Sequence, residues 1–535
     1  MPKMLARARL TALLALAVSA ESRSAWADER IEDPELTGDR KPAEAPGAAP
    51  TPAAAGDERI EDPELGGAKP ATDSGGFSNR PEYPHDAVLR VTLGTRWGMD
   101  THWTGPSQDI VEGTSIASVE MEQRRSEVLL VSLGLRARYA FGMRKSGTTI
   151  TELDAVPISG FADVTPTAGY HVRVGYQVTE LGRFDLFNAT NVLAVYDLRS
   201  GPLTMNGAAA VGQPAVRFDY DGTPGFALQA YYVPFVVPHL VSVYGTNYSL
   251  FTPFDRAADA LGADRSAETS LVRQRTAGLA KGGLDAFAPA PNFTKPQGAV
   301  RATVSGSSGE LSATVATAVE HLPTLGVNTT TTNPAEVIDP HYDRFGLFSV
   351  DGATDAGPVQ LGFELAYMMH RTLPSVAFQT LGTPPVTGWF PGPPGHTDMA
   401  QAGLHGELVL DATALEAEAF GIVALNDAPG GGAWPVLQHD RWLGGIAGGV
   451  HYEPEGSPFK AELGGAFILG PTALLLPRVE WQAVHTVYLE LGAVLVTGPT
   501  PAWNSAVSYV AGPALALGGL YRDVVNVFTG VRWVP

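Results

Sequence analysis

The chain of 535 residues contains no cysteine. This absence excludes disulfide frameworks, thiolate metal sites and thiol nucleophiles. Charged residues are also scarce: Asp, Glu, Lys and Arg make up 17% of the sequence, against about 25% in soluble domains. Low charge, 60 glycines and a near-neutral mean hydropathy are typical of a wide barrel with a lipid-facing band. The net charge of −20 opposes binding to nucleic acid, so we expect no such partner.

Long hydrophobic runs are missing as well. The mainly apolar run from Leu10 to Ala20 is much shorter than the roughly 20 residues that a membrane-spanning helix needs, and no later segment offers a charge-free stretch of that length. It follows basic residues and precedes Ala25-Trp26-Ala27, so residues 1–27 are predicted to form a signal peptide that is cleaved after Ala27, with Ala20 as the second choice.

What the sequence does contain is a repeat of two residues. From Leu89 onward, apolar side chains alternate with polar or small ones, and the same alternation returns over most of the chain. Successive side chains of a strand point to opposite faces, and only a closed barrel leaves no unpaired edge in lipid. Residues 85–535 therefore predict an all-β fold, an antiparallel up-and-down transmembrane barrel of about 16–18 strands in the bacterial outer membrane.

A soluble β-sandwich also alternates, but two features favour the barrel. Aromatic residues gather toward strand ends, where membrane-interface girdles are expected, and the chain ends on a strand from Val525 to Trp533. The aromatic residues are Trp97, Tyr139, Phe141, Tyr452 and Trp533. The clearest strands are predicted near 87–97, 127–141, 167–179, 214–233, 298–320, 357–369, 400–425, 438–452, 457–469, 478–496 and 523–533, several holding two antiparallel segments.

Residues 28–84 are rich in Ala, Pro and acids and lack an apolar period, which predicts a disordered periplasmic arm. Inside it, the motif DERIEDPEL at residues 28–36 returns unchanged at residues 57–65. One interpretation is a duplicated docking peptide for a periplasmic partner, because two weak contacts gain from high effective concentration. The other is a tandem duplication without a partner.

Two long interruptions divide the strands. Residues 239–297 include stretches of helical composition and predict a loop that is either an outer lid or a plug in the lumen. Residues 381–398 are rich in Pro and Gly, which predicts a second exposed loop rather than a strand.

If the apolar residues face lipid, the charged residues between them line the pore. Their sign changes once along the chain, with Asp219 and Lys460 as exceptions, so neighbouring strands would form a basic wall and an opposite acidic wall. Such a charge-segregated lumen would orient dipolar or zwitterionic solutes. Alternatively, these groups meet across neighbouring strands or a plug and stabilise a filled interior. The predicted pore-lining residues are Arg90, Arg96, Arg136, Arg138, Arg173, Arg217, Arg301, Glu364, Glu407, Glu416, Glu418, Glu462, Glu480 and Glu490.

Enzymatic motifs are absent: no Gly-x-Ser-x-Gly, His-Glu-x-x-His, Walker or dinucleotide-binding pattern occurs. His405 and Glu407 would lie on one face of a strand, and such a pair is more often pore lining than catalytic. We therefore expect a non-enzymatic protein with no catalytic residue, metal or cofactor.

Residues 181–193 (LGRFDLFNATNVL), Asp197-Leu198-Arg199 and Tyr232-Val233-Pro234-Phe235 carry a resemblance. This pattern resembles a family of large outer-membrane barrels of poorly defined role, which implies a wide barrel of porin or export type. The C-terminus departs from the family, because Val534 and Pro535 follow Trp533. Within the pattern, a loop that folds inward would form a constriction, or local ion pairs would fix its turn. The candidate residues are Arg183, Asp185, Asp197 and Arg199.

The sequence thus predicts a channel in outer-membrane lipid that moves hydrophilic solutes or polymers. One alternative is an export port for surface polysaccharide that is coupled to a periplasmic partner through the repeated motif. Another is a plugged barrel whose loops bind a surface partner. The oligomeric state stays open.

Overall fold

The computed structural model describes the barrel strands and the connections nearest to them. The predicted signal peptide and arm lie outside the described residues. Within the described part, no helix has the length and apolar character to cross a membrane. The described residues are 87–100, 109–126, 128–144, 149–182, 189–199, 210–240, 295–321, 324–327, 338–373, 375–381, 386–391, 394–431, 434, 441–468, 472–497 and 525–535.

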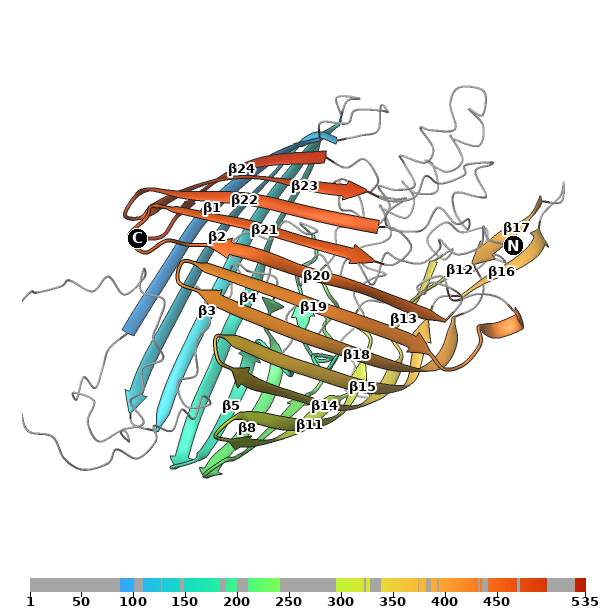
Figure 1. Cartoon of the computed structure of the whole chain (residues 1–535), viewed down its shortest axis with the longest axis horizontal. Helices are drawn as coiled ribbons and strands as arrows, with labels where there is room; N and C mark the ends of the chain where they lie inside the picture. Colours follow the sequence, from blue (N-terminus) through green and yellow to red (C-terminus); the bar gives the residue numbers. More distant parts are fainter. Residues whose placement is uncertain are drawn as a thin grey trace, which may run out of the picture.

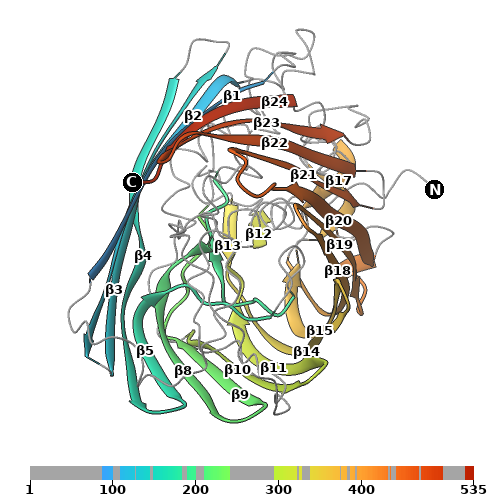
Figure 2. The same cartoon turned by 60° about the vertical axis from the view of Figure 1, so that its left-hand side comes forward.

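The described strands form one antiparallel sheet of 18 strands that closes on itself (Figures 1 and 2). Neighbours in the sheet follow chain order, and closure occurs where β1 pairs with β24, from Leu93 opposite Trp533 to Asp100 opposite Asn526. The predicted up-and-down barrel of 16–18 strands is confirmed. The barrel strands are β1 (Ala87–Asp100), β2 (Asp109–Ser126), β3 (Leu129–Arg144), β4 (Thr149–Thr167), β5 (Tyr170–Gln177), β8 (Gln213–Thr223), β9 (Phe226–Val233), β10 (Gln297–Gly306), β11 (Gly309–Val319), β14 (Arg344–Ala356), β15 (Val359–Leu373), β18 (Gly395–Leu410), β19 (Thr413–Ala424), β20 (Trp442–Tyr452), β21 (Phe459–Ile468), β22 (Thr472–Val484), β23 (Val487–Thr497) and β24 (Val525–Trp533).

Three pairs of short strands lie outside this sheet. They are β6 (Val195–Tyr196) with β7 (Ala210–Val211), β12 (Thr324–Val327) with β13 (Ile338–His341), and β16 (Val376–Leu381) with β17 (Val386–Pro391). The prediction of a strand-free loop over residues 381–398 is wrong, because β17 and the start of β18 fall within it. Proline is tolerated there because Pro391 is the last residue of β17 in a two-stranded sheet, where its missing N–H does not interrupt the hydrogen bonds between the strands. Nearly all of the predicted lid or plug at 239–297 lies outside the described residues.

Connections differ sharply between the two ends of the barrel. At one end neighbouring strands are joined by tight turns, and Gly169 (φ 79°) and Gly225 (φ 74°) supply the positive φ that such turns need. The opposite end carries the long connections, such as residues 178–212 and 234–296. Ala87, where β1 begins, and Pro535 both lie at the end with tight turns, which is the periplasmic side in bacterial barrels.

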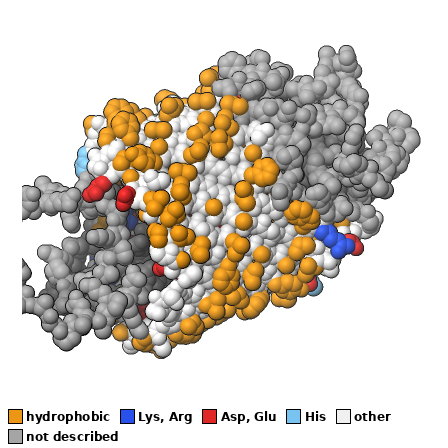
Figure 3. All heavy atoms as spheres, in the orientation of Figure 1, with side chains coloured by type: hydrophobic (Ala, Val, Ile, Leu, Met, Phe, Trp, Pro, Cys, Tyr) orange, Lys and Arg blue, Asp and Glu red, His pale blue; other side chains and the backbone are white. Residues whose placement is uncertain are grey.

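The outer face of the barrel is apolar, and orange side chains cover it in Figure 3. Leu153, Leu404 and Val315 are 75%, 65% and 60% exposed, which only hydrocarbon accommodates on this scale. Exposed aromatic residues gather in two girdles, as at membrane interfaces. They are Tyr170, Phe226, Tyr452, Phe459 and Trp481 toward the tight turns, and Trp97, Tyr139, Tyr232, Tyr367, Trp442 and Phe467 toward the long connections. The protein is therefore an outer-membrane β-barrel.

We expect the replacement Val315→Arg, in the middle of β11, to destabilise the barrel by about 2–4 kcal/mol, because its side chain faces the hydrocarbon core. The matched variant is Leu311→Arg, on the same face of β11 but beside the tight turn, where the cost should be about 0–1 kcal/mol. Urea unfolding in lipid vesicles measures both. Equal costs at the two positions would contradict the membrane depth assigned here.

Candidate functional site: the barrel interior

The strand register places the predicted pore-lining residues on the inner face, opposite the apolar outer one. Arg96, Arg136, Arg138, Arg217 and Arg301 are all less than a tenth exposed. Arg90 differs, because it is exposed at the end of β1 near the tight turns. The buried glutamates are Glu364, Glu418 and Glu480, and the half-buried ones are Glu407, Glu416, Glu462 and Glu490.

Four inner arginines of the first half contact carboxylates on their own strand, on a neighbouring strand or, for Arg301, two strands away. Arg301 forms a bidentate pair with Asp351 across β10, β11 and β14, at 2.6 and 2.7 Å. The remaining pairs are Arg138 with Glu152 (3.0 Å), Arg173 with Asp163 (2.7 Å) and Arg217 with Asp219 (2.7 Å). The wall that was expected to be basic therefore also carries acids. At these positions the structure corresponds to the alternative in which charged groups meet across the strands of the wall.

Several of the inner arginines also contact an aromatic ring. The guanidinium carbon lies 4.4 to 5.8 Å from a ring centroid in each case, within the range of a cation–π contact. A carboxylate on one side and a ring on the other fix the orientation of the guanidinium group. The pairs are Arg96 with Phe528, Arg173 with Phe161, Arg217 with Tyr231, Arg371 with Phe345 and Arg532 with Tyr488.

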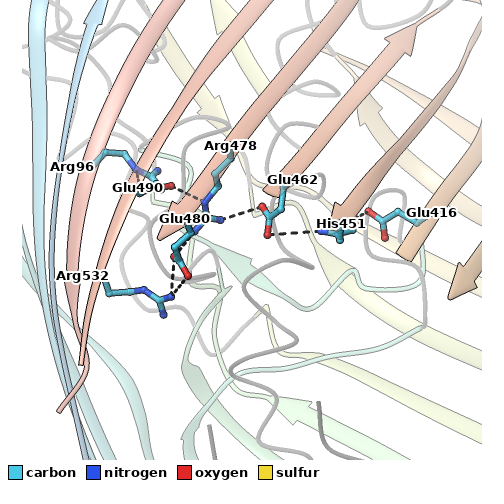
Figure 4. A network of polar contacts seen from close by, with 8 residues as sticks. All are labelled: Arg96, Glu416, His451, Glu462, Arg478, Glu480, Glu490 and Arg532. Atoms are coloured by element: carbon cyan, nitrogen blue, oxygen red, sulfur yellow. Dashed lines mark hydrogen bonds and ion pairs between the residues drawn. The ribbon is translucent and has the colours of Figure 1, made fainter. Parts of the chain in front are cut away.

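A row of charges runs along the inner wall from β19 to β24 and on to β1, and we name it the charged belt (Figure 4). Each acid of the belt contacts at least one basic side chain, and the acids Glu480 and Glu490 lie directly opposite each other in the register. Its members are Glu416, His451, Glu462, Arg478, Glu480, Glu490, Arg532 and Arg96.

The belt crosses the closure of the barrel because Gly530 has no side chain. Gly530 lies between Arg96 and Glu490 in the register, and a Cβ there would meet the Glu490 carboxylate at 2.8 Å. Arg96 therefore reaches over β24 and binds both carboxylate oxygens of Glu490, at 2.7 and 3.2 Å. This bidentate contact links the first strand to the strand before the last.

Residues 189–199, which we name the inner segment, lie inside the barrel. The segment belongs to the connection between β5 and β8, yet it contacts the wall at β14 and β15. The Thr190 backbone N–H donates to the Glu364 carboxylate at 2.7 Å, and its hydroxyl donates to Ser349 at 2.9 Å. At the other side, Thr179 and Gln213 both donate to the Leu193 carbonyl. The segment is thus tied to separate parts of the wall.

Two of the constriction candidates belong to this segment. Arg199 pairs with Asp197 at 2.7 Å and with Asp154 of β4. Burial opposes the charged form of Asp197, but the hydrogen bond and charge of Arg199 outweigh it and lower the pKa of Asp197. The local ion pair that sequence suggested is present, and it also contacts the wall. Arg183 and Asp185 lie outside the described residues.

An apolar cluster packs the inner segment against one side of the wall. Leu181 and Leu193 are 2% and 0% exposed and belong to one cluster with Phe345 and Leu347 of β14. Burying a leucine contributes about 1.5–3 kcal/mol. The segment is therefore held by hydrophobic burial as well as by its hydrogen bonds.

Two histidines join the inner segment to the connections that follow β9 and β11. The rings of His239 and His321 stack with centroids 5.4 Å apart, and Tyr196 donates its backbone N–H to Nδ1 of His239. Burial lowers the pKa of His321 to about 4, and burial together with His321 and Arg371 lowers the pKa of His239. Both rings are therefore neutral at pH 7.

His405 and Glu407 lie on the inner face of β18, as the sequence predicts. His405 lies opposite Glu418 of β19, and Nδ1 is 3.3 Å from the carboxylate. Within the described ranges, no group of three or more His, Asp or Glu residues is arranged to hold a metal ion.

Sequence reasoning did not identify several of the side chains that pair with the predicted pore-lining residues. Arg478 and Arg532 alternate with apolar residues inside predicted strands, so the same pattern was sufficient to find them. Asp163 and Asp351 lie in β4 and β14, two strands that were not predicted.

An apolar outer band around a charged interior gives this chain the architecture of a porin-type outer-membrane barrel. No known protein-family profile matches the sequence, and no curated protein matches it. Among solved structures it is similar to OccAB1 of Acinetobacter baumannii, with 8% identity, a TM-score of 0.44 and coverage of 84% of this chain and 96% of that one. It is also similar to OpdK of Pseudomonas aeruginosa, with 9% identity, a TM-score of 0.41 and coverage of 84% of this chain and 99% of that one. For OmpF of Salmonella typhi in complex with daunomycin, the identity is 10%, the TM-score is 0.36, and the coverage is 84% of this chain and 98% of that one.

We expect a double-mutant cycle on Arg96 and Glu490 to show coupling across the closure. Arg96→Met should destabilise the barrel by about 2–3 kcal/mol, because it leaves a buried carboxylate with fewer partners. The double variant with Glu490→Gln should recover about 1 kcal/mol or more of that loss. Urea unfolding measures the cycle, and strictly additive effects would show that the pair is not coupled.

Acid should loosen the junction of His239 and His321. Because the folded-state pKa of His321 lies near 4 and the unfolded value near 6.5, the unfolded chain binds more protons between these values. Stability is full above pH 6.5 and falls as the pH drops toward 4, by about 3 kcal/mol for the whole shift. Unfolding at pH 7 and pH 5 tests this, with His239→Asn/His321→Asn as the control that should lose less stability in acid. An equal loss in the control would contradict the assignment.

Proposed function

We propose that this protein is a channel through which small hydrophilic solutes cross the outer membrane. The observation that supports this most is the partial exposure of the charged belt. The side chains of His451, Glu462, Arg478 and Arg532 are 27%, 22%, 20% and 19% exposed, although they point into a closed barrel. Barrels of 16–18 strands are wide enough to leave an aqueous passage. Charges that keep contact with water favour such a passage beside the belt.

The inner segment would narrow this passage from the side opposite the belt. In this proposal Asp197 and Arg199 form part of the constriction, and the predicted Arg183 and Asp185 would belong to the same connection. The contacts of Arg199 with Asp154 and Glu152 of β4 support a fixed rather than a swinging arrangement.

A reduced form of the charge segregation fits this proposal. Glu407 and Glu416 lie directly opposite each other on β18 and β19, next to Glu418, while Arg136 and Arg138 lie on β3 in a distant part of the wall. A field between these two sectors would orient dipolar solutes. Pairing shortens the range of this field, because Arg138 contacts Glu152 and Glu416 contacts His451.

A second candidate is the plugged barrel, and the burial of Leu181 and Leu193 favours it. An inner segment packed by an apolar cluster closes part of the lumen. Polysaccharide export depends on the repeated motif at 28–36 and 57–65, which lies outside the described residues, and it stays a hypothesis from sequence.

Planar-bilayer recording distinguishes these candidates. We expect the wild-type protein to give discrete conductance steps and Glu364→Ala to give larger ones, because this change removes the carboxylate that holds Thr190. The matched control is Glu310→Gln, near a tight turn at the far end of β11, and its steps should match the wild type. Wild-type silence that ends with Glu364→Ala would support the plugged barrel, and silence of both would reject the channel.

A further inference from the structure

We infer that Arg478 and Glu462 form a binding site for zwitterionic solutes, such as amino acids and short peptides, in the charged belt. The inference rests on the proposed channel function and names the solute class that the belt would recognise.

Arg478 lies close to three carboxylates of the belt. Its Nε lies 2.8 Å from the Glu490 carboxylate. Its two terminal nitrogens make long contacts of 3.4 Å each, Nη1 with Glu462 and Nη2 with Glu480. Hydrogen bonds at this length are weak. The Nη1–Nη2 edge is the one that binds a carboxylate with two parallel hydrogen bonds, so the loosely engaged edge suits an incoming carboxylate.

Glu462 is the matching acceptor for an ammonium group. It lies between two cations, with Arg478 at 3.4 Å and His451 Nδ1 at 3.8 Å. Both are long compared with the 2.7 Å pair of Arg96 and Glu490 in the same belt. An ammonium group that approaches to about 2.8 Å would replace two long contacts by one short, charge-assisted hydrogen bond.

His451 keeps the belt balanced on this side. Both nitrogens of its ring face carboxylates, Nε2 toward Glu416 at 3.4 Å and Nδ1 toward Glu462 at 3.8 Å. A neutral imidazole has one acceptor nitrogen, which would point its lone pair at a carboxylate, so this position suits the doubly protonated ring. With His451 positive, four cations face the four glutamates of the belt.

This balance determines which solute can bind. An anion alone would take the terminal nitrogens of Arg478 from Glu462 and Glu480 and leave one half-buried and one buried carboxylate without that contact. A cation alone would do the reverse to Arg478. A solute that carries both charges replaces three long contacts by two short ones, and Glu480 and His451 keep Arg532 and Glu416 as partners. Neutral solutes gain neither contact.

Bilayer recording with glycylglycine as the probe tests this site. We expect glycylglycine to interrupt the wild-type current at concentrations about fivefold to tenfold lower than N-acetylglycylglycine, which lacks the cation, or glycylglycine amide, which lacks the anion. Glu462→Gln and Arg478→Lys should each remove this preference. Lysine keeps the charge of Arg478 but cannot bind a carboxylate through two parallel hydrogen bonds.

The matched control is Glu453→Gln. Glu453 pairs with Lys460 at 2.7 Å next to the same strands but outside the belt, and it is 53% exposed. This variant should keep the preference for glycylglycine. Equal interruption by the three probes in the wild type, or an unchanged preference in Glu462→Gln and Arg478→Lys, would overturn the site. A wild-type protein that carries no current would instead reject the channel itself.

Discussion

The pairing of β1 with β24 is the constraint on which the rest of this structure depends. In hydrocarbon every backbone N–H and C=O needs a partner, and an open sheet edge would leave a row of them exposed. Closure provides those partners and gives every strand one face toward lipid and one toward the interior. The alternation in the sequence, the apolar outer band and the inward charges all follow from it. Arg96 and Glu490 reinforce the same closure from inside, across Gly530.

Charges that are forced inward must then find partners, because water reaches them only in part. The barrel meets this need through nearby strands: Arg173 pairs with Asp163 of the neighbouring strand, and Arg301 pairs with Asp351 two strands away. It also separates the interior into two regions. Around Leu193 the wall and the inner segment share an apolar cluster, while the belt around Arg478 keeps charges partly exposed. Rigidity and access to water thus belong to different parts of one lumen.

The fold was largely predictable from sequence because lipid exposure demands a strict alternation. Three strands of the barrel were not predicted, each for a physical reason. The outer face of β2 carries Gly113, Ser115 and Ala117 beside the larger side chains of its neighbours, so its apolar face is weak. In β4 the extra residue Ile158 forms a bulge and breaks the period. In β14, Phe345 and Leu347 point inward to the apolar cluster, so both faces are apolar. Because β4 and β14 were not predicted, Asp163 and Asp351 were missed as well. The predicted charge segregation was therefore stronger than the segregation in the structure.

The interior contacts were beyond any local pattern, and this matters for function. Thr190 and Glu364 are 174 residues apart, and nothing in the composition near either one indicates the other. Apart from Arg96, the belt members follow chain order around the wall, but which acid meets which base depends on the register of neighbouring strands. In such a paired interior, a single-sign field is short-ranged, and a solute is recognised mainly where it can exchange an existing ion pair. In the proposed site, the long contact between Arg478 and Glu462 is such a pair, and both side chains are partly exposed.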